Sequence, residues 1–550
     1  MKKHNIIKVV LLTILLFVLL TWILPAASFS SEFYDQGRIQ MGLFDLFNYP
    51  ITALSYFGYI GLYIIIIGGF YGILYKIPAY RTLLDKISTA FAKRSKVAIP
   101  VIMLLLAVMV SICGLQLGLL VFFPFIASII LLMGYDKIVV ALTLVGSTTI
   151  GIAGTTYAYN NVSILNSLLG TELDNSMGVK VLILVVGLAL LIFNTLMYMK
   201  KVNVVKKDTK VVEEKTNKVE SITIDEKEVE DEIVEEKVEV KKTTSTAKKS
   251  TSSSKSSSKK TNGKKSNKKK SSKSSKNNKA AVTDDEVIVV KKSEDNDDYL
   301  VPNGDSKKHT VLPVACSLIA LFIILVLAFI PWNHAFSILA MEDATNSVMD
   351  FQLFGFPIFA KLLGTFNTFG DWMISDMIVV MAVIILVLSL IYKLKVDDVF
   401  DGFIAGAKKA VAPALVAVLV YTVLVVVTYH PFQLTIYKAI LTLTKGFNVF
   451  TATIVAILSS IFNADPAYAF QAVVPYLTSL VTDSEVYPII EVLFQSVYGF
   501  TMLFAPTSLV LMATLAYLGV SYKEWLKAIW KLLVELLVLL LILFTVLVMM

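Results

Sequence analysis

Cysteine and histidine are scarce in this chain, and their scarcity argues against several classes of protein. The two cysteines, Cys113 and Cys316, lie in apolar segments, and the four histidines are scattered. None of them has the spacing of a metal site or a redox motif. The G-x-x-x-x-G-K-[ST] loop, which would indicate an ATP-driven pump, is missing as well. Without a nucleophile, a metal cluster or a histidine-containing constellation, the chain is not expected to be an enzyme.

Apolar residues, in contrast, are abundant. Hydrophobic side chains make up 56% of the 550 residues, and the mean hydropathy is +0.72. A soluble protein of this size cannot bury so much apolar surface, so the composition predicts a polytopic membrane protein. We expect an all-α fold with about nine to eleven transmembrane segments in the cytoplasmic membrane.

One long charged insert interrupts the apolar sequence. Residues 200–310 are rich in Lys, Ser and Glu and hold 28 of the 50 Lys and Arg and 21 of the 42 Asp and Glu. The net charge of +8 therefore belongs mainly to this insert and does not indicate a nucleic-acid-binding domain. Because so few large apolar groups cannot offset the entropy lost on ordering, we predict a disordered cytoplasmic linker. Contact of its Lys/Ser run with anionic lipid or RNA is the alternative to a solvated linker.

The N-terminal membrane part, residues 1–199, contains two irregular segments. Residues 97–134 are too long for one crossing and are interrupted by glycines, which predicts either a helical hairpin that enters and leaves on one side or two full spans. Residues 138–158 form a span that contains the letters GSTTIGIAGTTYA. Glycines and hydroxyl groups in the middle of a span are typical of the broken helices that form transporter sites.

The C-terminal membrane part, residues 373–550, repeats this order. A second hairpin is predicted over 447–481 and a second broken helix over 487–519. The break lies at Pro506, because proline removes a helical N–H group and clashes with the carbonyl one turn earlier. A connecting helix, 311–331, places the two parts in opposite orientations, so we predict two inverted repeats.

Polar groups at the hairpin tips and the breaks are the candidate ligands. Hydroxyl and carbonyl oxygens can coordinate Na⁺, and helix N-termini can hold a carboxylate. The candidate binding residues are Gln116, Thr148, Thr149, Thr155, Asp465, Gln495, Thr501, Thr507 and Ser508. The residues expected to break or turn the backbone are Gly114, Gly118, Gly151, Gly154, Pro466, Gly499 and Pro506. The alternative is that the hydroxyl groups only bond to their own helices or join neighbouring helices.

Asp465 stands out because it is a carboxylate in a predicted hairpin tip. Such a charge is costly in a membrane unless a partner or water compensates it. We therefore expect Asp465 to bind a proton, Na⁺ or a substrate amine. The alternative is a turn at the outer surface, since Asp-Pro is favourable turn chemistry. Glu491, near the outer end of its span, is interpreted as solvated.

Lysines predict which ends face the cytoplasm. Lys2, Lys3 and Lys8 precede the first apolar run, so the N-terminus is expected inside, together with the lysine-rich insert. The C-terminus is then expected outside. A signal peptide cleaved near Ala27 is the alternative for the first apolar run, Val9–Ala27, although this run exceeds the usual length of such peptides.

Several motifs resemble those of the YfcC-like carriers. They are TWILPA at 21–26, GYD at 134–136, GFT and PTS at 499–501 and 506–508, and GVSYKEW at 519–525. These carriers group with the DcuC-type dicarboxylate carriers, the arginine/ornithine-antiporter-like proteins and the AbgT transporters in the ion transporter superfamily. The resemblance covers the membrane part without the insert. It implies two hairpins and two broken helices around a central site, elevator-like transport and a homodimer.

The hairpin tips depart from the family pattern. The first tip often reads Gly-Met-Gly-Glu-Glu in the family, whereas residues 114–118 of this chain read GLQLG. The second tip usually contains Pro-Ser-x-Ser-Gly, whereas residues 464–468 read ADPAY. The resemblance therefore carries over the scaffold, and it leaves the substrate and the coupling ion open.

Together, these features predict a secondary active transporter. Its cargo is a small organic solute, either an amino acid, a short peptide or a C4-dicarboxylate, coupled to H⁺ or Na⁺ or moved by exchange. No cofactor is expected besides a possible Na⁺ or H⁺ as coupling ion, and the sequence identifies no Na⁺ ligands. The alternative is a transport-inactive membrane scaffold that uses the insert as an interaction arm. Deleting residues 205–305 would separate the two, because a carrier would keep its transport.

Overall fold

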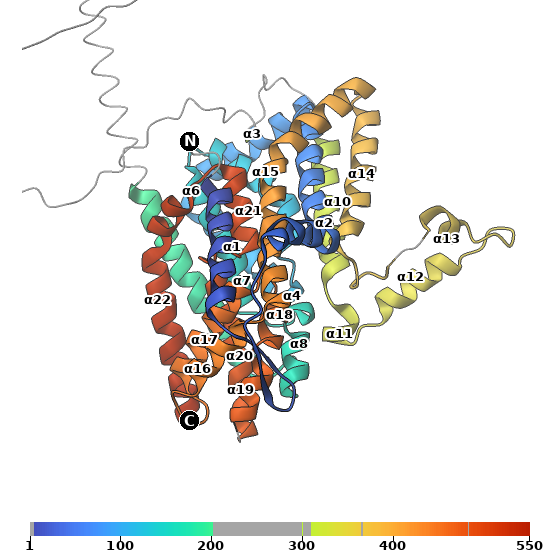
Figure 1. Ribbon diagram of the computed structural model, residues 1–550. Coiled ribbons are helices and arrows are strands. Elements are labelled where there is room, and N and C mark those ends of the chain that lie inside the picture. Colours follow the sequence, from blue (N-terminus) through green and yellow to red (C-terminus); the bar gives the residue numbers. More distant parts are fainter. Residues whose placement is uncertain (1–4, 202–299, 301–309, 365–366, 482) are drawn as a thin grey trace, which may run out of the picture. The chain divides into compact units, whose positions relative to one another are not determined.

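The structure is almost entirely helical, as the composition predicts. The computed structural model describes residues 5–201, 300, 310–364, 367–481 and 483–550 (Figure 1). Eight helices within these ranges are long and apolar enough to cross a membrane, which confirms an all-α polytopic membrane fold. The charged insert lies outside the described residues except at its ends. The strands in the described part form one short antiparallel hairpin, β1 (Ala26–Phe29) and β2 (Phe33–Gly37).

The first half of the chain runs from a single span through a long helix and a helical hairpin to an interrupted helix. Its labelled helices are α1 (Asn5–Ile23), α2 (Leu43–Leu74), α3 (Pro78–Ala92), α4 (Ser95–Cys113), η1 (Gly118–Phe122), α5 (Phe123–Leu132), α6 (Lys137–Ala141), η2 (Leu142–Gly146), α7 (Ser147–Ala153) and α8 (Tyr159–Leu169). The helix Met177–Lys201 closes this half.

A connecting helix and three short helices lead into the second half, which has the same order of elements. The connecting segment contains α10 (Leu312–Phe329), α11 (Trp332–Phe336), α12 (Ala340–Asp350) and α13 (Ile358–Leu363). The second half contains α14 (Ile374–Ile391), α15 (Val396–Tyr429), α16 (Gln433–Leu441), α17 (Val449–Phe462), α18 (Pro466–Gln471), α19 (Val474–Leu480), η4 (Ser484–Val486), α20 (Tyr487–Met502), α21 (Leu509–Leu518) and α22 (Tyr522–Met549).

Local sequence explains several helix ends at the predicted tips and breaks. α4 ends at Gly114, whose φ angle of 67° lies in the left-handed region that glycine adopts without strain. α18 begins at Pro466 and α20 has Pro488 in its first turn, where the missing N–H group would have no helical partner in any case. α22 begins with a capping box, in which Ser521 and Glu524 each accept the backbone N–H of the other.

Glycines bring the two longest helices together. α2 and α15 run antiparallel, and Gly68 and Gly72 of α2 face Gly402 and Gly406 of α15. A Cβ atom at Gly406 would clash with the carbonyl oxygen of Gly68, and one at Gly72 would clash with that of Gly402. Each helix thus offers its partner a small-x-x-x-small pattern, which lets two membrane helices approach closely. The letters GGFYG and GFIAG carry this pattern, which is not among the predictions above.

Replacing Gly406 with valine is therefore expected to destabilise the protein. The new side chain would have to separate the backbones of α2 and α15, and overpacking of this kind costs roughly 1–3 kcal/mol. The midpoint of thermal unfolding in detergent should fall. Gly178→Val is the control, because a Cβ there would meet no atom within 4 Å. Equal midpoints for the two variants would contradict a close contact between α2 and α15.

Candidate functional site

The two interrupted helices cross where the first of them ends. Gly499 of α20 lies directly against Ala153, the last residue of α7, and a Cβ at Gly499 would clash with the backbone of Ala153. α7 also packs closely on α4, because a Cβ at Gly151 would lie 2.6 Å from the carbonyl oxygen of Ala107. Three of the predicted elements, namely both interrupted helices and the first hairpin, therefore meet at one point.

The first break, residues 154–158, has backbone groups paired by two other elements. Ser111 of α4 donates its hydroxyl to the carbonyl oxygen of Gly154 at 2.6 Å and accepts the N–H of Thr156 at its own carbonyl. Gln495 of α20 donates its amide to the carbonyl oxygen of Ile152 at 2.9 Å and to the hydroxyl of Thr155 at 3.1 Å. These bonds compensate the backbone groups that the break frees, as a low-dielectric environment requires.

The second break, residues 503–508, is paired in a similar way. The indole of Trp525 donates to the carbonyl oxygen of Leu503 at 2.8 Å, and the hydroxyl of Tyr522 donates to that of Phe504. Both donors come from the first turn of α22. Thr507 in the break donates its hydroxyl to the carbonyl oxygen of Ile461 at the end of α17, at 2.8 Å. The break thus joins α22 to the second hairpin.

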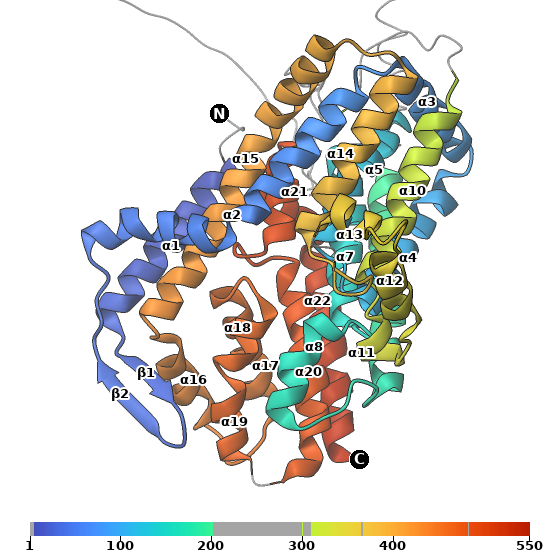
Figure 2. The same ribbon diagram turned by 90° about the vertical axis from the view of Figure 1, so that its right-hand side faces the viewer.

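Both hairpin tips reach the interrupted helices. A Cβ at Gly114, in the first tip, would lie 3.3 Å from Ala158 and 3.4 Å from Asn161, at the start of α8. In the second tip, the carbonyl oxygen of Ala464 accepts the hydroxyl of Tyr498 on α20 at 3.0 Å. α8 packs against both α18 and α20 (Figure 2). The start of α8 is therefore a point to which both halves of the chain contribute.

Several buried polar atoms near this meeting point have no hydrogen-bond partner within the described part of the chain. They are the Oε1 atom of Gln495, the Nδ2 atom of Asn161 and the hydroxyls of Ser147 and Ser496. A buried polar group without a partner costs about 1–3 kcal/mol. These atoms comprise a donor, an acceptor and two hydroxyls that can serve as either.

The predicted binding residues divide into three groups. Thr155 and Gln495 bond to each other, and Thr507 joins a break to a hairpin, as described above. Thr148, Thr149 and Thr501 are buried and donate to carbonyl groups of their own helices at 2.7, 2.8 and 2.7 Å, which is the arrangement of the alternative interpretation. Gln116 is half-buried in the first tip, and Ser508 is buried where α21 begins.

Several of the residues predicted to break or turn the backbone contact neighbouring helices. Gly118 accepts the hydroxyl of Tyr63 at its carbonyl oxygen, at 3.2 Å. A Cβ at Gly154 would lie 2.5 Å from the side chain of Leu184 in the closing helix Met177–Lys201. Pro506 lies within the second break, between α20 and α21.

Asp465 caps the short helix α18 at the second tip. Its carboxylate accepts the N–H of Ala467 at 2.9 Å, and the residue is only partly exposed. The cap is the Asp-Pro turn of the alternative interpretation, but a carboxylate that accepts one bond can still accept others. Among the described residues, no group of three His, Cys, Asp or Glu side chains could hold a metal ion.

Glu491 is the clearest correction to the sequence analysis, because it is buried and paired rather than solvated. Its side chain is 0% exposed and lies 2.8 Å from the ammonium group of Lys180, which is 2% exposed. Asn175 donates to the second carboxylate oxygen at 3.2 Å, and Lys180 also donates to the carbonyl of Leu173. Since Glu491 precedes Gln495 by one turn of α20, the pair lies beside the first break.

The comparison with known families gives one match. The matching family model is described as the C4-dicarboxylate anaerobic carrier, and it covers residues 51–249 and 247–550. Comparison with curated proteins and with solved structures gave no match. The family match supports the dicarboxylate-carrier part of the resemblance, while the relationship to the YfcC-like and AbgT proteins stays a prediction.

The buried ion pair makes a specific prediction about stability. Lys180→Met leaves the Glu491 carboxylate buried without a counter-charge and is expected to cost about 3–5 kcal/mol. Combining it with Glu491→Gln removes that charge, so the double variant should recover much of the loss. Thermal unfolding of the single and double variants in detergent measures both effects. Losses that simply add in the double variant would contradict a direct ion pair.

Proposed function

The chain belongs to the C4-dicarboxylate anaerobic carrier family, and from this premise we propose that it is a secondary active transporter of a four-carbon dicarboxylate. The eight apolar helices make it a multi-pass membrane protein, and the family is one of carriers rather than enzymes. The substrate site in this proposal is the meeting point of the two interrupted helices and the start of α8.

The unpaired buried polar atoms at that point carry the proposal. A dicarboxylate needs hydrogen-bond donors for two carboxylate groups in place of the water that it loses. The start of α8 supplies the positive end of the helix dipole and the unpaired Nδ2 atom of Asn161. The hydroxyls of Ser147 and Ser496 supply two further donors.

The charge of the cargo gives a reason for coupling to a cation. Lys180 is a cation beside the first break, and Glu491 already neutralises it. A dianion that enters this site would therefore add negative charge to a low-dielectric region, which is costly unless a cation accompanies it. We take this cation to be H⁺ or Na⁺, with exchange for another anion as the other way to balance the charge. Carbonyl and hydroxyl oxygens at the breaks and the carboxylate of Asp465 are the candidate ligands.

The packing supports an elevator-type movement within this proposal. Hydrogen bonds join each hairpin to one interrupted helix and the two interrupted helices to each other, so these elements would move as one body. α2 and α15 pack through glycines and would form the scaffold, at which two copies of the chain could associate. The start of α1 and the end of α22 lie at opposite ends of the membrane part (Figure 1), which fits an N-terminus inside and a C-terminus outside.

Uptake into proteoliposomes tests the proposed function. Purified protein would be supplied with labelled succinate or with a pool of labelled amino acids, with and without Na⁺ and pH gradients. Saturable uptake of succinate that responds to one of the gradients, or to dicarboxylate loaded inside, supports the proposal. No uptake by protein that unfolds cooperatively would overturn it and favour the transport-inactive scaffold.

A pair of threonine variants distinguishes a ligand from a helix-bonding hydroxyl. Thr501 and Thr422 are both buried, and each donates to the carbonyl four residues earlier, at 2.7 and 2.9 Å. Thr501→Val is expected to reduce uptake roughly tenfold to a hundredfold, because a hydrogen bond to a charged group contributes about 1.5–3 kcal/mol. Thr422→Val, on the scaffold helix α15, should leave uptake unchanged. Equal effects would mean that Thr501 only bonds to its own helix.

Asp465 is tested through the coupling ion. If its carboxylate binds the coupling H⁺ or Na⁺, Asp465→Asn should abolish the response of uptake to that gradient. Asp483→Asn is the matched control, because Asp483 also begins a short helix by accepting an N–H two residues on, at 2.9 Å, but is exposed. Unchanged pH and Na⁺ dependence in Asp465→Asn would assign Asp465 to the turn alone.

A further inference from the structure

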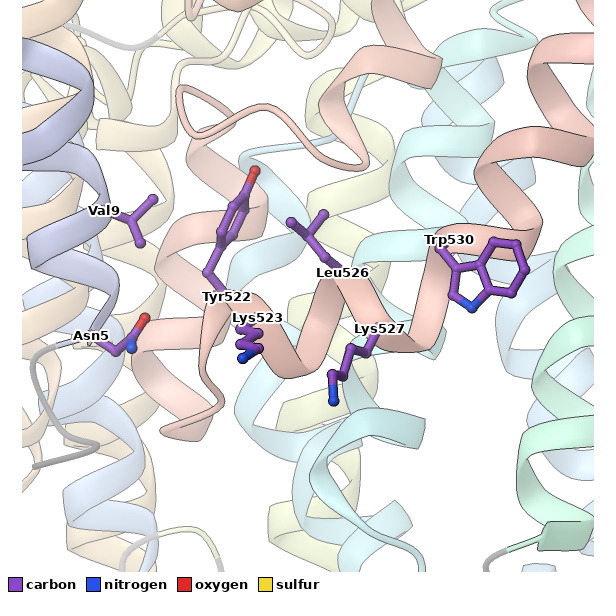
Figure 3. Close-up of a pocket in the computed structure, with 7 residues that line it drawn as sticks. All are labelled: Asn5, Val9, Tyr522, Lys523, Leu526, Lys527 and Trp530. Atoms are coloured by element: carbon purple, nitrogen blue, oxygen red, sulfur yellow. The ribbon is translucent and has the colours of Figure 1, made fainter. Parts of the chain in front are cut away.

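A groove lies between the first turns of α1 and α22, away from the proposed substrate site. Its volume is about 440 Å³, and it is open to the surface (Figure 3). The residues that line it are Asn5, Val9, Tyr522, Lys523, Leu526, Lys527 and Trp530. Both helices are candidate membrane spans that begin here, so the groove lies where the apolar part of each span meets the membrane surface.

The groove combines cations with an apolar wall. Lys523 and Lys527 are exposed, lie one turn apart on α22 and direct their amino groups the same way (Figure 3). Val9, Leu526 and Trp530 supply the apolar surface, and Trp530 is 56% exposed. Tryptophan at the start of a span is typical of the boundary between headgroups and acyl chains.

The apolar surface continues along α22 beyond the groove. Exposed apolar side chains continue along α22 after Trp530; they are Val534, Val538, Ile542 and Val546. The exposed surface of α22 therefore carries the basic side chains Lys523 and Lys527 at its start and apolar side chains farther along the span. This order of charge and apolar surface complements a phospholipid that has a negative headgroup at the membrane surface and acyl chains below it.

We propose that this groove binds an anionic phospholipid. Its phosphate would lie between Lys523 and Lys527, and an acyl chain would lie against Val9, Leu526 and Trp530. A zwitterionic lipid has the same acyl chains but no net charge, so it would occupy the groove less tightly. α1 packs mainly on α15 and α22 packs mainly on α20 and α17, while α1 and α22 also contact each other. The lipid would thus bridge the proposed scaffold and the proposed moving elements.

The groove is also connected to the second break. Tyr522, which lines it, donates its hydroxyl to the carbonyl oxygen of Phe504, and Trp525 in the same turn donates to that of Leu503. A lipid that holds the first turn of α22 would hold these two donors against the break. Binding of the lipid does not depend on the proposed function, whereas an effect of the lipid on transport does.

Lipid binding to the purified full-length chain tests the proposal. Phosphatidylglycerol would be titrated into protein in neutral detergent and followed by native mass spectrometry, with phosphatidylcholine as the zwitterionic comparison and glycerol phosphate as the headgroup alone. We expect phosphatidylglycerol to bind more tightly than phosphatidylcholine, and glycerol phosphate not to bind. Combining Lys523→Gln with Lys527→Gln should weaken the binding of phosphatidylglycerol roughly thirtyfold.

The control and a second variant keep the test decisive. Lys93→Gln combined with Arg94→Gln removes two exposed positive charges elsewhere and should leave binding unchanged. Val9→Trp fills the groove without changing the charge and should also displace the lipid. Equal binding of the two phospholipids, or equal loss in the groove and control variants, would overturn the proposal. Loss of lipid binding without loss of uptake would leave the site in place and contradict only its connection to transport.

Discussion

The structure depends on one constraint, which is that a helix broken inside a membrane must find partners for the backbone groups it frees. Two helices are broken here, and both breaks are paired by side chains from elsewhere in the chain. Ser111 and Gln495 donate hydrogen bonds to backbone carbonyls at the first break, and Tyr522 and Trp525 do so at the second. The partners of a break come from different helices, so the breaks hold the hairpins, the crossing helices and α22 together.

The residues that pair the first break also belong to the proposed binding site. Gln495 donates its amide nitrogen to a freed carbonyl and to Thr155, and its oxygen is left buried without a partner among the described residues. The side chain that stabilises the first break thus also offers an acceptor at the centre of the proposed site. Asn161 offers a donor where Gln495 offers an acceptor, since its amide nitrogen has no partner among the described residues at the start of α8. A site built in this way changes whenever the break itself changes, which is a useful property in a carrier.

The order of elements could be predicted from the sequence because it depends on local patterns. Glycine and proline interrupt apolar runs at Gly114, Pro466 and Pro506, and these positions are helix ends or breaks in the structure.

The pairing of side chains could not be predicted in the same way. Thr155 and Gln495 were both selected as candidates, but nothing local indicates that they bond across 340 residues of sequence. Lys180 and Glu491 are separated by 311 residues, and a charge near the end of an apolar run is usually solvated. Burial of the pair follows from the packing of two distant helices.

The segment GVSYKEW, one of the motifs that carry the family resemblance, can be explained residue by residue. Gly519 ends α21 in the left-handed conformation, and the capping box that starts α22 occupies the serine and the glutamate. The tyrosine and the tryptophan pair the carbonyl groups of the second break, and Val520 is buried. Lys523 is exposed and lines the groove beside α1. Its place at the start of a span, beside Trp530 and above exposed apolar side chains of α22, gives it surroundings that suit the headgroup of the proposed phospholipid.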